Sequence, residues 1–434
     1  MSDATPLTAN SMVVDTSAAL PPRARQLIRY VFSVLGPISM AGAHFIGALI
    51  FFRTLPRSDF GLLSFAMAIV PLFLSLTGAM FGVSLVNSAN GTSAMSEDEL
   101  HTYMKGGLLF ASASGAILFA LMVAATATSA VATIVALYGA VMSLRWFARC
   151  HAFATHNMKR AIISDVVYSA MLLGNLLVFN FARQHSPVAA SAILSASAFC
   201  ALLAFGGDFM IAQRRAILHG SLRAFMPIWR DLSRWSVLGV VSTEITANAH
   251  VYLVTFIAGP KAFALLAVGS LFMRPVSLVV GALPDAERPT MARDIAQGKF
   301  AKAMRSVFQF RMASLAVLTG TLMLAAIIFI WFPQLILKKG YDETSVIAVV
   351  AIWTLIMAVR AMRTPESILL QTLGEYRALA AASVSSSFAS LAITLALLLC
   401  FGPVVSLAGI LVGDIVMSWR ILAMGRAWRK KVSV

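Results

Sequence analysis

The sequence predicts an all-α polytopic membrane protein with about twelve transmembrane helices in two six-helix bundles. Of its 434 residues, 59% are hydrophobic and only 12% are charged, and the mean hydropathy is +0.84. Water-soluble domains carry roughly 25% charged residues, so the apolar surface of this chain must face lipid. The same sequence pattern recurs in both halves, and this repeat predicts the two-bundle arrangement.

The repeat consists of short matching segments at equivalent places in the two halves. Val34–Gly36 corresponds to Val237–Gly239, and Phe60–Leu63 corresponds to Phe263–Leu266. Duplicated halves that open with the same helix pair are typical of membrane transporters.

Twelve apolar windows are long enough to span a bilayer, which requires roughly 20 apolar residues each. They lie near residues 27–52, 59–86, 106–127, 129–151, 162–181, 187–207, 234–257, 261–283, 305–331, 343–363, 376–400 and 403–424. We therefore expect a flexible cytoplasmic N-terminus (1–26), an N-terminal six-helix lobe (27–207), a cytoplasmic linker (208–233), a C-terminal six-helix lobe (234–424) and a basic cytoplasmic tail (425–434).

The linker between the lobes mixes basic and apolar residues. This pattern fits either an amphipathic segment in the inner membrane interface, acting as a hinge, or a solvated linker that carries orienting charges. The first 26 residues lack a charged start, and the apolar stretch that follows is too long for a cleaved signal peptide.

The net charge of +16 is distributed as in an oriented membrane protein. With a cytoplasmic N-terminus, the outer segments hold only six of the 34 Lys and Arg residues: Arg53, Arg57, Arg183, Lys261, Lys338 and Lys339. This positive-inside bias places both termini in the cytoplasm. The basicity thus reflects orientation and contact with anionic membrane lipid, and we expect no nucleic-acid partner.

Ionisable residues at membrane depth are the first candidates for function. In the seventh span, Glu244, Asn248, Tyr252 and Thr255 recur at helical spacing and form a polar stripe, while His250 falls on a different face. A carboxyl group near mid-membrane is a candidate for ion coupling.

Arg274 in the eighth span is followed directly by Pro275, which removes one backbone donor. Such a break is tolerated in lipid only beside other helices or a wet cavity. We therefore predict that Arg274 points inward, the alternative being a side chain that reaches the inner headgroups.

Other basic residues allow two interpretations each. His44 aligns with Ala247 in the repeat and suits either a cavity or a packing role, and Arg53 suits a cavity or an anchor at the outer interface. Arg145 and Arg149 share a helix face and either line a vestibule or reach the inner headgroups.

Basic groups at membrane depth outnumber acidic ones. Arg360 and Arg363 on the tenth span, like Arg145 and Arg149, either line a vestibule or reach the inner headgroups. Asp414 lies near the middle of the last span. Because basic groups outnumber Glu244, Asp165 and Asp414, the interior suits an anionic head group such as a diphosphate.

Catalytic and metal-binding motifs are absent from the sequence. There is no phosphate-binding loop, no zinc-protease motif and no nucleophile elbow, and the three cysteines have no paired spacing. We expect no catalytic residues, no metal site and no cofactor, and therefore no enzymatic activity.

The pattern as a whole resembles the MOP exporter superfamily, and within it the Wzx-type polysaccharide flippases. The resemblance rests on the twelve helices in two repeats and on these segments: Phe60–Ala66, Ala264–Gly269 ahead of Arg274-Pro275, Gly281–Pro284, Trp331–Pro333 through Gly340-Tyr341, and Gln371–Glu375.

The resemblance implies a V-shaped pair of bundles in the bacterial inner membrane that moves an undecaprenyl-diphosphate-linked oligosaccharide outward by alternating access. It implies a cationic central cavity, which this sequence would match with some of His44, Arg53, Arg145, Arg149 and Arg274. Polysaccharide polymerases and glycosyltransferases of the same pathway would be partners. Coupling to a proton or sodium gradient would fall to Glu244 or Asp414.

Two rival functions remain at this point. A multidrug or major-facilitator exporter is the first, although a cation extruder should have an acidic interior. The second is a membrane enzyme of the same glycan pathway, which would need a large outer loop that this sequence lacks.

Overall fold

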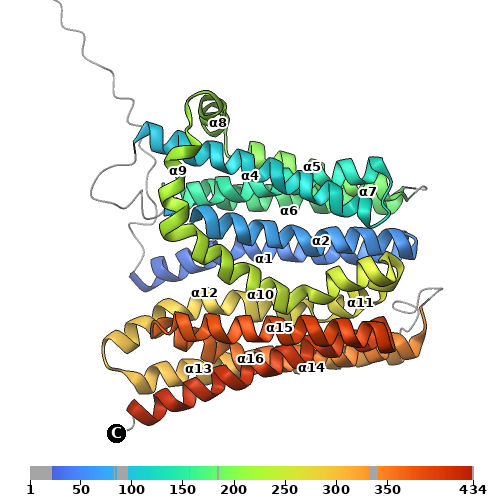
Figure 1. Cartoon of the computed structure of the whole chain (residues 1–434), viewed down its shortest axis with the longest axis vertical. Coiled ribbons are helices and arrows are strands. Elements are labelled where there is room, and N and C mark those ends of the chain that lie inside the picture. The colour runs from blue at the N-terminus through green and yellow to red at the C-terminus, as the bar shows by residue number, and fades with distance from the viewer. Residues whose placement is uncertain are drawn as a thin grey trace, which may run out of the picture.

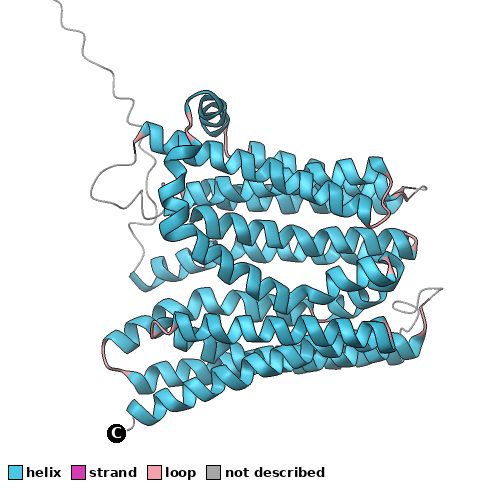
Figure 2. Cartoon of the chain, viewed as in Figure 1, coloured by secondary structure: helices cyan, strands magenta, loops and turns pink. Residues whose placement is uncertain are grey.

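The computed structural model describes residues 22–82, 84–85, 96–155, 157–182, 185–331 and 341–432. Within these ranges every regular element is a helix, as Figure 2 shows. The helices run side by side along one direction and form two groups, α1–α7 and α10–α16, which we call the N-terminal and C-terminal halves (Figure 1).

The N-terminal half contains six helices, and a side chain caps the start of three of them, α4, α5 and α7. Ser96, Thr128 and Ser186 each accept a hydrogen bond from a backbone N–H of the first turn, at 3.2, 3.5 and 3.2 Å. The helices are α1 (Pro22–Thr54), α2 (Arg57–Thr77, continued by a π-helical turn at Gly78–Gly82), α4 (Glu97–Ala124), α5 (Ser129–Ala154), α6 (Met158–Phe181) and α7 (Pro187–Leu203).

The expected linker is helical. It comprises α8 (Gly207–His219), α9 (Leu222–Ile228) and a π-helical turn at Trp229–Ser233, and α8 leaves α7 at 95°. Both short helices pack on the N-terminal half, because Lys105 Nζ donates to the Gly220 carbonyl at 3.0 Å and the Phe225 ring lies 5.4 Å from that of Phe81. Ile211 and Leu218 of α8 are exposed beside Arg214 and Arg215, so apolar and basic side chains share the surface of this helix.

The C-terminal half repeats the plan of the first. Asp342 caps α14 by accepting a hydrogen bond from the Ser345 N–H at 2.8 Å, and this bond lowers the pKa of the Asp342 carboxyl group. The helices are α10 (Arg234–Leu253, continued by a π-helical turn at Val254–Ala258), α11 (Pro260–Phe272), α12 (Arg274–Ala296), α13 (Phe300–Trp331), α14 (Glu343–Thr372), α15 (Tyr376–Phe401) and α16 (Pro403–Val432).

Nine helices in the described ranges are long and apolar enough to cross a membrane, and the number rises to eleven if each bent pair is one span. The described apolar part of α1, Ile38–Thr54, is shorter. These helices account for the twelve predicted windows, with one difference of form. The eighth window is broken into α11 and α12, which meet at 61°, because Pro275 cannot donate the hydrogen bond that would continue α11.

Both ends of the chain are more helical than the sequence indicated. Helix α1 begins at Pro22, inside the expected flexible terminus, and residues 1–21 lie outside the described part. Helix α16 continues to Val432, so the expected tail from residue 425 extends this helix. Most of the connection between the ninth and tenth spans, which the sequence places at about Phe332 to Asp342, also lies outside the described part, since residues 332–340 are not described.

The two halves touch tightly at the end of the bundle opposite the C-terminus, where α2 meets α11 (Figure 1). Arg57 Nε donates to the Lys261 carbonyl at 3.0 Å, and Gly61 lies directly against the Pro260 carbonyl. A Cβ at Gly61 would collide with that backbone, so only glycine allows this approach. The Phe65 ring closes the contact with Phe256 at 5.5 Å.

Candidate functional site

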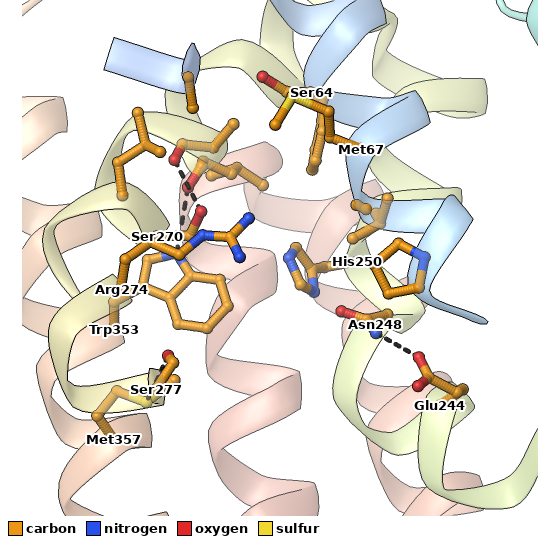
Figure 3. A pocket seen from close by; sticks show the side chains of 18 of the residues that line it. Ser64, Met67, Glu244, Asn248, His250, Ser270, Arg274, Ser277, Trp353 and Met357 are labelled. Carbon is orange, nitrogen blue, oxygen red and sulfur yellow. Dashed lines mark hydrogen bonds between the residues drawn. The ribbon is translucent and has the colours of Figure 1, made fainter. Parts of the chain in front are cut away.

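A polar cavity of about 250 Å³ lies between the halves, and we call it the central cavity. Helices α10, α11, α12 and α14 form most of its wall, and α1 and α2 close it from the N-terminal half. Its polar side chains come almost entirely from the C-terminal half, as Figure 3 shows.

Arg274 lies at the break between α11 and α12 and lines the central cavity. It is the first residue of α12, and its guanidinium extends across the pocket toward His250 and Asn248 (Figure 3). Among the described residues, no carboxylate lies within ion-pair distance of Arg274. The first turn of α12 thus presents a positive side chain and a helix N-terminus, and both favour an anion.

Glu244 faces the same cavity from α10. It accepts a hydrogen bond from Asn248 Nδ2 at 2.7 Å, which agrees with the helical spacing seen in the sequence. In the described part of the chain, Glu244 forms no ion pair. The central cavity therefore holds one carboxylate and one guanidinium that are each without an oppositely charged partner.

His250 also lines the central cavity, although the sequence placed it on a different face from Glu244. Both residues line the cavity because it extends around more than one face of α10. The His250 ring lies 5.4 Å from that of Trp353, whose Nε1 donates to the Leu266 carbonyl at 3.2 Å. The His250 side chain is buried, and its Nδ1 makes no hydrogen bond.

Arg360 connects the central cavity to a second one of about 300 Å³ beside it. Its Nε donates to Asp414 at 2.8 Å, and Arg363 Nη1 donates to the other oxygen of Asp414 at the same distance. Arg360 Nη2 is buried, with no hydrogen-bond partner among the described residues. Arg360 therefore lines both cavities while Asp414 holds its Nε.

A third and larger space, of about 1100 Å³, continues from these two along α10, α14 and α15. It shares Glu244 with the central cavity and Thr243 with the second cavity, and its far wall carries Arg288 and Arg377. The shared wall residues place the three spaces next to one another. They lead from Arg274 along the C-terminal half and end in further basic side chains.

Arg145 and Arg149 lie elsewhere, inside the N-terminal half. Arg145 donates to Asp165, and Arg149 Nη1 lies 2.8 Å from the second oxygen of that carboxylate. Arg145 and Asp165 are fully buried, and Ser164 accepts from Arg145 Nε at 2.9 Å. The guanidinium of Arg145 therefore neither reaches the headgroups nor lines a vestibule.

His44 extends this buried network toward the central cavity. Its Nε2 lies 3.0 Å from the Tyr168 hydroxyl, and the two rings stack at 5.4 Å. His44 lies within electrostatic range of both Arg145 and Arg274, so it stands between the buried cluster and the cavity cation.

The structure brings together only part of the predicted site. Arg274, Glu244 and Asn248 line the central cavity. Tyr252 packs near the Phe65 ring, at 6.5 Å, and Arg53 lies exposed at the rim of a separate apolar groove. The remaining predicted residues lie outside the central cavity: His44, Arg145 and Arg149 in the buried network, and Asp414 beside the second cavity.

Glu366 is an acidic residue at membrane depth that the sequence analysis did not count. It is fully buried and receives Arg311 at 2.9 Å and Arg429 at 2.8 Å. A signal was present, because Glu366 follows Arg363 by one helical turn on α14. Among the described residues, no group of three His, Cys, Asp or Glu side chains could hold a metal ion.

Among the comparisons with known proteins, the one with solved structures found matches. No family model matches the chain, and no curated protein matches it. A multidrug resistance MATE family transporter of the MOP superfamily, in its inward-facing conformation, superposes with a TM-score of 0.67 at 13% identity, covering 91% of this chain and 95% of that one. The chain has the MATE/MOP transporter fold.

Two further structures place the fold more fully. The lipid II flippase MurJ, in an inward closed conformation, gives a TM-score of 0.66 at 13% identity over 91% of this chain and 87% of that one. A MATE family transporter in an outward-facing conformation gives 0.58 at 13% identity over 94% and 96%. Each similarity covers more than nine tenths of the chain, and the chain is a multi-pass membrane protein.

Proposed function

We propose that this protein is a flippase that moves a polyprenyl-diphosphate-linked oligosaccharide across the bacterial inner membrane by alternating access. The observation that carries the proposal is Arg274, a guanidinium that lines a cavity between the halves and forms no ion pair with any described residue. A cation at this depth is costly unless water or a bound anion compensates it. A diphosphate supplies that charge, and Arg360 adds a second positive charge to the wall of the same cavity.

The access path supports an export direction. The neighbouring cavities follow one another from Arg274 along the C-terminal half, whereas Arg57, Gly61 and Pro260 close the opposite end. With the termini in the cytoplasm, as the sequence predicts, this arrangement is inward-open. The higher TM-score with the inward-facing MATE structure, 0.67 against 0.58 with the outward-facing one, supports the same assignment.

Coupling to a proton or sodium gradient falls to Glu244 in this proposal. Asp414 was the other candidate, but two arginines hold it, each at 2.8 Å. Among the described residues, Glu244 has Asn248 as its one hydrogen-bond partner, and it faces the central cavity. Its charge is therefore free to change during transport, and Glu244→Gln should make glycan movement independent of the gradient.

The proposal is tested by reconstitution into liposomes. Lipid-diphosphate-glycan translocation is measured for the wild-type protein, for Arg274→Ala and for Arg420→Ala, which removes an exposed arginine from α16. Wild type and Arg420→Ala should move the glycan, and Arg274→Ala should not. Normal translocation by Arg274→Ala would remove this residue from the mechanism.

Export of cationic drugs is the second candidate, and Glu244 is the observation that favours it. An unpaired carboxylate in a central cavity can bind a cation, and two of the similar structures are multidrug resistance transporters. Efflux of a cationic dye from the same liposomes distinguishes the two. Dye efflux without glycan movement would replace the flippase proposal with this one.

A further inference from the structure

An apolar groove of about 530 Å³ lies on the outside of the wall that encloses the central cavity. Helices α1, α6, α11, α12 and α13 form it, and we call it the lateral groove. Ile46, Leu49, Leu177 and Leu324 on its rim are between 38% and 60% exposed, so the groove opens to the surrounding bilayer.

The lateral groove and the central cavity lie back to back across the break between α11 and α12. Leu271 lines both, while Arg274 faces the central cavity and Pro275 faces the groove. On α1, Ala48 faces the cavity and the adjoining Leu49 faces the groove. The break between α11 and α12 therefore has the charged central cavity on one side and the apolar lateral groove on the other.

The charge of the groove is concentrated at one place. Arg53, in the last turn of α1, is exposed at the rim, and the other lining residues are uncharged. Arg53 lies toward the end of the bundle opposite the C-terminus, since α1 ends there beside the turn to α2 (Figure 1). An occupant with a long apolar chain and an anionic group near that end would match both features.

We propose that the lateral groove binds the first isoprenoid units of the transported lipid on its release side, with the diphosphate at Arg53. This inference rests on the proposed flippase function. The two compartments on either side of the helix break explain this order physically. Before transfer the diphosphate occupies the central cavity at Arg274, and after transfer the isoprenoid chain of the lipid is held in the lateral groove. Burial of isoprenoid methyl and methylene groups supplies the affinity.

The experiment uses site-specific photocrosslinking in liposomes that contain the polyprenyl-diphosphate glycan and excess phosphatidylglycerol. A benzophenone amino acid replaces Leu324 on the groove rim or, as a matched control, Leu355 on α14, which lines none of the described cavities. The two leucines are 55% and 53% exposed, so bulk lipid should reach both equally.

The Leu324 position should capture the polyprenyl lipid about tenfold more than the Leu355 position, a preference that corresponds to about 1.4 kcal/mol. Leu49→Trp, which fills the groove, should abolish this preference. Equal capture at the two positions, or capture of phosphatidylglycerol in place of the polyprenyl lipid, would overturn the proposal.

A second measurement separates this proposal from the flippase proposal. Binding of a short-chain diphosphate glycan that cannot fill the groove is measured on the same wild-type and Leu49→Trp proteins. If the short-chain ligand binds both proteins and the long-chain capture shows no preference, the groove proposal fails and the flippase proposal stands. If neither ligand binds the wild-type protein, both proposals fail.

Discussion

Two clusters of the same composition occur in the two halves, each with two arginines and one aspartate. Arg145 and Arg149 of α5 hold Asp165 of α6, and Arg360 and Arg363 of α14 hold Asp414 of α16. Helices α5 and α14 are the fourth spans of their halves, so the arginine pairs occupy equivalent helices while the aspartates do not.

Their surroundings differ. The cluster around Asp165 is sealed between α1, α5 and α6, and Arg145 is only 2% exposed. The cluster around Asp414 borders the second cavity, and Arg360 also reaches the central cavity. The comparison shows that one arrangement of charges ties helices together in the N-terminal half and forms part of a binding wall in the C-terminal half.

The largest effect is expected for Asp165→Ala. This change leaves the buried guanidinium of Arg145 and the largely buried one of Arg149, which are 2% and 12% exposed, without their counter-ion. The loss should be about 3–5 kcal/mol of folding stability, chiefly through Arg145. Thermal unfolding of the detergent-solubilised protein checks it. An unchanged melting temperature would mean that the cluster does not tie α5 to α6.

Asp414→Ala should cost less, about 2–3 kcal/mol. Arg360 and Arg363 are 19% and 14% exposed beside a cavity, so water can solvate them when the carboxylate is removed. Glycan translocation should nevertheless fall sharply, because Arg360 is no longer positioned at the cavity wall. A stability loss as large as that of Asp165→Ala would contradict the difference drawn between the clusters.

A smaller effect is expected for Gly36→Ala, which disturbs the Asp165 cluster without removing a charge. A Cβ at Gly36 would collide with the Asp165 carboxylate, whereas a Cβ at Gly42 on the same helix meets no atom within 4 Å. Gly36→Ala should cost about 1–2 kcal/mol. Gly42→Ala is the matched control and should leave the melting temperature unchanged or slightly raised.

The sequence predicted the fold well because composition and apolar windows are local properties. The window at 129–151 became α5 at Ser129–Ala154, and the window at 376–400 became α15 at Tyr376–Phe401. The break at Pro275 was also anticipated, although its size, a 61° bend with two separate helices, depends on packing against neighbours.

The site was predicted less completely, because ion pairs join helices that are distant in sequence. Arg274 and the Glu244–Asn248 pair could be selected from a proline break and a helical spacing. Nothing local shows that Asp165 pairs with Arg145, or that Asp414 pairs with Arg360. These features depend on how the helices face one another across the bundle.

The most direct test of the central claim is binding of an anionic head group at Arg274. Affinity for a short-chain polyprenyl diphosphate is measured by titration calorimetry on wild-type protein, Arg274→Ala and the control Arg420→Ala. The account predicts that Arg274→Ala binds about 10 to 100 times more weakly, the loss expected for hydrogen bonds to a charged group, and that Arg420→Ala binds as the wild type does. Equal affinity in all three proteins would contradict the assignment of the central cavity as a diphosphate site.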